Sequence, residues 1–132
     1  MSDEQQARQQ LLARQFIEAI PHAQALGMKV AEIGAGRAVI TMPYDERLIG
    51  DPETGVIHGG AVSALMDTCG GAAVMSHPSS PMGTATIDLR IDYMRAAKPG
   101  DMITAIANTI NAPCIVSFPV GQETLKASCL TS

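Results

Sequence analysis

The sequence has 132 residues, about the length of one domain, and is 46% hydrophobic and 17% charged. This balance is typical of a chain that folds around a core and excludes disorder along its whole length. The net charge is −4, aromatic residues make up only 3%, and no Lys/Arg cluster occurs. These features argue against a nucleic-acid binder, which uses a basic surface or stacking rings. We treat residues 1–132 as a single domain.

The cysteines and the N-terminal residues bear on location. Cys69, Cys114 and Cys129 show no CxxC spacing, so the sequence predicts neither a disulfide framework nor a zinc site. Reduced thiols suit a cytosolic protein better. The first residues contain no apolar signal core, and no apolar run reaches the roughly 18 residues that span a membrane. We expect a cytoplasmic protein that binds neither metal nor membrane.

The first predicted element is a helix over residues 3–20. Ser2 or Asp3 can cap its start, and an apolar stripe recurs at helical spacing: Leu12, Ala13, Phe16, Ile17 and Ile20. Pro21 ends the pattern. We expect this helix to pack on the edge of the domain, with a lid over a ligand channel as the alternative.

Two strands are predicted within residues 26–42, joined at the turn Gly34-Ala35-Gly36. A polar loop follows over residues 43–54. A loop of this length inside a compact domain is more often functional than idle.

The central predicted element is a helix over residues 58–76. It is apolar on nearly every side, which is typical of a helix buried in a core. Between Glu53 and Asp88 only Asp67 carries a formal charge. A buried carboxylate needs a partner or a function, so Asp67 is the leading candidate functional residue. The alternative is a structural acid bonded to a hydroxyl such as Ser63.

Strands dominate the rest of the chain. Residues 84–94 alternate strictly, and residues 102–109 predict another strand after the turn at 95–101. The segments 114–118 and 124–129 are plausible short strands, but residues 110–132 are weakly patterned. Strands grouped after a helix predict an antiparallel α+β domain, in which one sheet wraps the apolar helix.

The start of the central helix offers anion-binding chemistry. Gly59 and Gly60 let a ligand approach the backbone, and the first N–H groups of a helix are unpaired and partly positive. His58 stands at the same end. Asp67, nine positions later, points to the opposite side, roughly 13 Å along the axis. The two ends can share one site if two copies of the helix run antiparallel across a symmetric dimer.

Two segments of the sequence resemble the hotdog-fold acyl-CoA thioesterases, most closely the phenylacetyl-CoA thioesterase (PaaI-like) branch. The first segment is DPETGVIHGG (residues 51–60) followed by LMDT (65–68); the second is TIDLRIDYM (86–94) followed by AKPGD (97–101). The resemblance covers roughly residues 25–110. It implies a curved antiparallel sheet around a long helix, with dimers and often tetramers that hold the site between subunits.

The resemblance also implies roles for individual residues. Asp67 matches the helix carboxylate that acts as nucleophile or general base. Gly59 matches the backbone N–H that polarises the thioester carbonyl, and His58 matches the histidine beside it. Thr86 matches a Ser/Thr position that orients water or the carboxylate.

Two departures from the family pattern stand out. Many relatives carry Asn in the loop before His-Gly-Gly, as an amide donor, where Asp51 is the nearest candidate here. An ionised Asp cannot donate a hydrogen bond. The segment 110–132 lacks the well-patterned last two strands, and their loss would weaken the sheet edge. Within the strand over 84–94, strict alternation also turns Thr86 away from Ile87 and Leu89, so it needs a bulge or a second subunit to reach the site.

We therefore expect an acyl-CoA thioesterase that acts on an aromatic or medium-chain substrate. The helix N-terminus polarises the carbonyl, and Asp67 attacks it or activates water. Substrate binding is assigned to Gly60 and to cations that can meet the CoA phosphates: Arg90, Arg95 and Lys98. No cofactor is expected, because CoA is part of the substrate. The alternatives are a hydratase or dehydratase of the same fold, a non-catalytic acyl-CoA-binding module and, as a weak third idea, Cys69 as a nucleophile.

Overall fold

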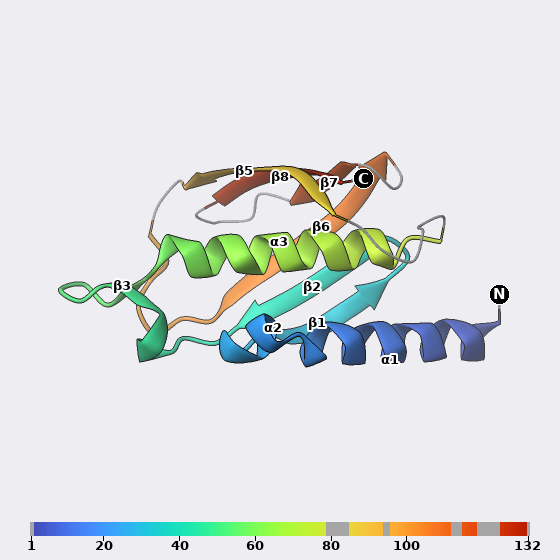
Figure 1. Cartoon of the computed structure of the whole chain (residues 1–132), viewed down its shortest axis with the longest axis horizontal. Coiled ribbons are helices and arrows are strands. Elements are labelled where there is room, and N and C mark those ends of the chain that lie inside the picture. The colour runs from blue at the N-terminus through green and yellow to red at the C-terminus, as the bar shows by residue number, and fades with distance from the viewer. Residues whose placement is uncertain (1, 79–84, 94–95, 112–114, 119–124, 132) are drawn as a thin grey trace.

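The computed structural model describes residues 2–78, 85–93, 96–111, 115–118 and 125–131, and side chains as far as residue 110, Ile87 excepted. A six-stranded antiparallel sheet curves around one long central helix (Figure 1). The elements are α1 (Asp3–Ala19), α2 (Pro21–Ala25), β1 (Lys29–Gly34), β2 (Arg37–Met42), the 3₁₀ turn η1 (Glu46–Leu48), β3 (Ile49–Asp51), β4 (Val56–Ile57), α3 (Gly59–Met75), β5 (Thr86–Tyr93), β6 (Ile103–Asn111), β7 (Ile115–Phe118) and β8 (Leu125–Thr131). The predicted α+β class is confirmed.

The order of strands in the large sheet is β1-β2-β6-β7-β8-β5, and every neighbouring pair is antiparallel. The weakly patterned C-terminal segment therefore does form two strands. Our expectation that their loss would affect a sheet edge is wrong, because β7 and β8 lie inside the sheet and connect β6 to β5. The edges are β1 and β5.

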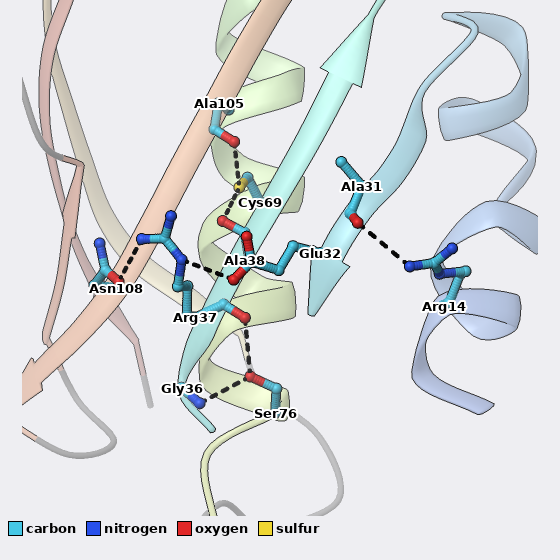
Figure 2. Close-up of polar contacts among 10 residues, drawn as sticks. All are labelled: Arg14, Ala31, Glu32, Gly36, Arg37, Ala38, Cys69, Ser76, Ala105 and Asn108. Carbon is cyan, nitrogen blue, oxygen red and sulfur yellow. Dashed lines mark hydrogen bonds and ion pairs between the residues drawn. The ribbon is translucent and has the colours of Figure 1, made fainter. Parts of the chain in front are cut away.

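Helix α3 lies between the two ends of the curved sheet and contacts all six of its strands (Figure 1). Most of its apolar residues are buried, as the pattern predicts: Ala61, Val62, Leu65, Met66, Cys69, Ala72, Ala73 and Val74. The fully buried Cys69 Sγ contacts the carbonyl oxygens of Ala38 on β2 and Ala105 on β6, each at 3.4 Å (Figure 2). These contacts hold the middle of the helix to the middle of the sheet.

The C-terminal end of α3 is tied to the turn between β1 and β2. Ser76 Oγ accepts a hydrogen bond from the Gly36 N–H at 3.0 Å (Figure 2). In that turn Ala35 and Gly36 have φ values of +50° and +82°. Two consecutive positive φ values match the twist of a tight hairpin, so the turn predicted here is confirmed.

Helix α1 begins as predicted, with Ser2 as its N-cap in a capping box with Gln5. It packs along the β1 edge, which supports an edge helix rather than a lid. Its apolar stripe is only partly buried. Ile17 is buried, whereas Leu12 and Phe16 are 55% and 56% exposed. Only part of the predicted stripe is therefore buried.

The predicted loop over 43–54 contains secondary structure that the sequence did not predict. It contains η1 and β3, and β3 forms a short hairpin with β4, which lies just after the loop. Tyr44 Oη donates a hydrogen bond to the Gly55 carbonyl oxygen at 2.7 Å, which ties the hairpin turn to the end of β2. Among the described residues, no helix is long and apolar enough to cross a membrane.

Candidate active site

The N-terminus of α3 is organised by His58, its N-cap residue. The Gly60 N–H donates to His58 Nδ1 at 2.8 Å, and the Ala61 N–H donates to the His58 carbonyl oxygen at 3.0 Å. No described residue accepts a hydrogen bond from the Gly59 N–H. This exposed N–H is the donor that the first turn leaves for a ligand, as expected at a helix start.

Two glycines are required here by close packing around His58. A Cβ at Gly60 would lie 2.9 Å from His58 Nδ1, and a Cβ at Gly50 would lie 2.7 Å from the His58 Cα. The His58 N–H also donates to the Leu48 carbonyl oxygen at 2.8 Å. Gly50 of β3 and Leu48 of η1 thus pack against His58.

Asp67 lies two turns further along α3 and is exposed in the single chain. The expectation of a buried carboxylate is therefore wrong, because the sheet leaves this side of α3 open. Thr86 Oγ1 donates to Asp67 Oδ1 at 2.6 Å. The pairing of β5 with β8 shifts register between Thr86 and Asp88, so the bulge that Thr86 needs is present.

The helix start and the carboxylate remain apart within one chain. Gly59 and Asp67 are separated by about 12 Å along the axis, at a rise of about 1.5 Å per residue. One carbonyl carbon cannot contact both. His58 is the N-cap of α3 and Asp67 lies within the same unbroken helix, so the two residues are separated along the axis as the sequence predicts.

Tyr93, at the end of β5, was not singled out from the sequence. Its Oη contacts the Gly59 carbonyl oxygen at 3.0 Å and Ser63 Oγ at 2.5 Å. Ser63, considered above as a partner of Asp67, therefore bonds elsewhere. The signal that could have found Tyr93 is its polar tip at the end of an apolar strand face, which needs a hydrogen-bond partner.

Asp51 directs its carboxylate into its own turn. Its oxygens accept hydrogen bonds from Thr54 Oγ1 at 2.7 Å and from the Glu53 N–H at 3.0 Å. These two bonds, that from Thr54 first, lower the pKa of Asp51 below its ordinary value. Asp51 is thus a charged acceptor in the turn between β3 and β4.

The three cations assigned to CoA phosphates occupy different positions. Arg90 lies on β5 within 3.9 Å of Asp92, and both side chains are exposed. Lys98 is exposed in the turn before β6, next to Pro99, which lies close to Gly55 of the β3–β4 hairpin. Arg95 lies outside the described residues.

Cys69 is not available as a nucleophile. Burial raises the pKa of its thiol to about 12, so the reactive thiolate is scarce near neutral pH. In the described part of the chain, no group of three or more His, Cys, Asp or Glu residues is arranged to hold a metal ion.

The segment that carries these residues is similar to known proteins. Residues 54–112 match the sequence profile of the Thioesterase superfamily. An esterase candidate from Halobacterium salinarum is 41% identical over 81 residues, which are 59% of this chain and 53% of that protein. The match therefore spans about half the length of that relative. The medium/long-chain acyl-CoA thioesterase YigI of Escherichia coli is 26% identical over 117 residues, 77% of this chain and 74% of YigI.

The fold comparison agrees. The structure of the E. coli PaaI protein, from the phenylacetic acid degradation operon, superposes with a TM-score of 0.72 over 98% of this chain and 94% of PaaI, at 24% identity. The matched profile contains His58, Gly59, Asp67 and Thr86, the residues through which the sequence resembles this family. Residues 54–112 thus carry the sequence profile of the Thioesterase superfamily, and the chain has the hotdog fold.

Proposed function

We propose that this protein hydrolyses acyl-CoA thioesters. Gly59 binds the carbonyl oxygen through its N–H, and Asp67 is the nucleophile or general base. The observation that carries the proposal is the pairing of an unpaired, exposed N–H at the start of α3 with an exposed carboxylate held by Thr86. Such a donor stabilises the oxyanion that develops when a thioester carbonyl is attacked. The similarity to YigI supports the same class of substrate.

The hydrogen bond from Thr86 suggests how Asp67 acts. It occupies Oδ1, and no described residue bonds Oδ2. Oδ2 is then the oxygen that attacks the carbonyl carbon or takes a proton from the attacking water. His58, with Gly60, shapes the entrance beside the carbonyl. The reaction needs no metal and no cofactor beyond the CoA of the substrate.

The site is completed by a second copy of the chain. Because Gly59 and Asp67 are far apart on one helix, the carbonyl bound at Gly59 must meet Asp67 of another subunit. A two-fold axis that sets two α3 helices antiparallel brings both pairs together at once. We propose a homodimer, which can pair further into a tetramer, acting in the cytoplasm.

The substrate is proposed to be an aromatic or medium-chain acyl-CoA. Lys98 and Arg90 are exposed cations that can meet the CoA phosphates, and Arg95 is assigned to the same role from the sequence. Asp51 remains a sequence-based assignment. With both oxygens engaged in its turn, it serves as a support of the hairpin beside His58 rather than as an amide-like donor.

The test is release of free CoA from a panel of aromatic and aliphatic acyl-CoAs, with the wild type and Asp67→Asn side by side. Asn keeps the size of the side chain but is a poor nucleophile and base. We expect turnover by the wild type and a loss of about 10²-fold or more in the variant. Equal turnover by both would make Asp67 structural. A folded wild type that binds acyl-CoA without turnover would favour the hydratase or the binding module.

A further inference from the structure

We propose that Tyr93 is a positioning residue for the thioester site: with Ser63, it holds the Gly59–Gly60 peptide, which keeps the first turn of α3 closed beside the Gly59 N–H and fixes the tautomer of His58. The proposal rests on the function proposed above. It concerns the two side chains that contact the first turn of α3 from β5 and from within the helix.

The direction of each hydrogen bond follows from counting protons. The Gly59 carbonyl oxygen can only accept, so Tyr93 Oη donates its one proton there, at 3.0 Å. Tyr93 then has no proton left for Ser63. The 2.5 Å contact between them is therefore a hydrogen bond from Ser63 Oγ to Tyr93 Oη.

The same chain of hydrogen bonds continues through the backbone to His58. The Gly59 carbonyl and the Gly60 N–H belong to one peptide group, and that N–H donates to His58 Nδ1 at 2.8 Å. Hydrogen bonds in series polarise one another, so a donor on the carbonyl strengthens the N–H on the other side. Since Nδ1 accepts, a neutral His58 carries its proton on Nε2.

The peptide between two glycines gains a further restraint from outside the helix. Neither Gly59 nor Gly60 has a Cβ, so rotation of this peptide meets little steric resistance. Such a rotation changes ψ of Gly59 and φ of Gly60, so it would open the first turn of α3 beside the Gly59 N–H and break the Gly60–His58 hydrogen bond. Tyr93 opposes it from outside the helix, and its ring lies 3.7 Å from the position of a Cβ on Gly59.

β5 thus contributes a hydrogen-bonding side chain to each end of the proposed site. Thr86, at its start, bonds Asp67, and Tyr93, at its end, bonds the helix start. Tyr93 is 52% exposed, so its hydrogen bond competes with water and its contribution is modest. We expect a partial loss of rate on its removal rather than abolition.

The kinetic test compares Tyr93→Phe and Ser63→Ala with Tyr44→Phe. Tyr44 is a matched control, because it also donates to a glycine carbonyl, that of Gly55, but outside α3. We expect Tyr93→Phe to lower kcat and kcat/KM together by about 3- to 10-fold, with KM nearly unchanged. Ser63→Ala should lower them less and Tyr44→Phe should leave both near wild type. Equal effects of the two Tyr→Phe changes would overturn the proposal.

A second measurement does not depend on turnover. NMR of the ¹⁵N-labelled protein follows the Gly60 amide proton and the ring nitrogens of His58. In the wild type we expect His58 to carry its proton on Nε2. In Tyr93→Phe, but not in Tyr44→Phe, the Gly60 amide resonance should move upfield as its hydrogen bond weakens. Unchanged Gly60 and His58 signals in Tyr93→Phe would overturn the proposal. A wild type without thioesterase activity but with these shifts would refute the proposed reaction alone.

Discussion

At the scale of single residues, the two adjacent glycines at the start of α3 differ, because packing requires a glycine only at Gly60. Gly60 is needed because a Cβ would collide with His58 Nδ1 at 2.9 Å. Gly59 faces no such collision, since its nearest neighbour is the Tyr93 ring at 3.7 Å. What Gly59 contributes to the proposed reaction is its N–H. Side-chain size and N–H can therefore be tested separately at this position.

Gly59→Pro removes the N–H while the helix is retained. Proline is tolerated at the first helical position, because the N–H that it lacks would have no partner within the helix in any case. His58 precedes it with φ −59° and ψ 133°, a conformation compatible with a following proline. We expect kcat to fall by about 10²- to 10³-fold in CoA-release assays.

Gly59→Ala is the control, because it keeps the N–H and adds only a methyl group. Its loss of rate should be much smaller than that of Gly59→Pro. Circular dichroism of both variants verifies that α3 forms. Similar rates for the two variants would show that the Gly59 N–H takes no part in the reaction.

At the scale of elements, α1 protects an edge of the sheet. Glu18 Oε1 accepts a hydrogen bond from the Val30 N–H at 3.0 Å. Arg14 donates to the Ala31 carbonyl oxygen at 3.4 Å (Figure 2). Unpaired groups on an edge strand invite pairing with other chains. The side chains of α1 thus occupy hydrogen-bonding positions of β1 that would otherwise be open.

Glu18→Ala should destabilise this edge. The Val30 N–H is left without its acceptor, so we expect the free energy of unfolding to fall by about 1 kcal/mol. Denaturant unfolding measures the loss, and hydrogen exchange at the Val30 amide should be faster. Gln9→Ala, at an exposed position of the same helix, is the control and should change neither. Slow exchange at Val30 in Glu18→Ala would mean that another group protects the edge.

At the scale of the whole molecule, the proposed reaction divides the site into two halves. The Gly59 end and the Asp67–Thr86 pair lie on the same helix, yet too far apart to act on one carbonyl. The side of α3 that carries Asp67 is open in the single chain, and β5, which bears Thr86, is an edge of the sheet. Both features favour a second subunit at this surface.

Subunit complementation tests the shared site directly. Asp67→Asn and Gly59→Pro are each expected to be nearly inactive alone. After unfolding and refolding together, about half of random dimers are mixed, and each mixed dimer has one intact site. The mixture should recover about a quarter of wild-type activity. Recovery near zero, with mixed dimers verified by native mass spectrometry, would place the whole site within one chain.

Local signals in the sequence were sufficient for several elements. The Ser2 cap, the Gly34-Ala35-Gly36 turn and the bounds of α3 each depend on residues within a few positions of one another. Local chemistry decides such features, so no knowledge of the rest of the chain is needed. The family resemblance likewise depends on contiguous motifs, and the matched profile confirms it.

Other features were decided only by the tertiary structure. β7 and β8 are weakly patterned, yet they form because β6 and β5 supply hydrogen-bonding partners on both sides. The bulge that turns Thr86 to Asp67 and the reach of Tyr93 to Gly59 join residues 19 and 34 positions apart. The sequence by itself determined which groups are available for chemistry, because residue type and helical spacing are local properties. Which of them meet was decided by strand register and sheet curvature, which arise from pairing across the whole chain.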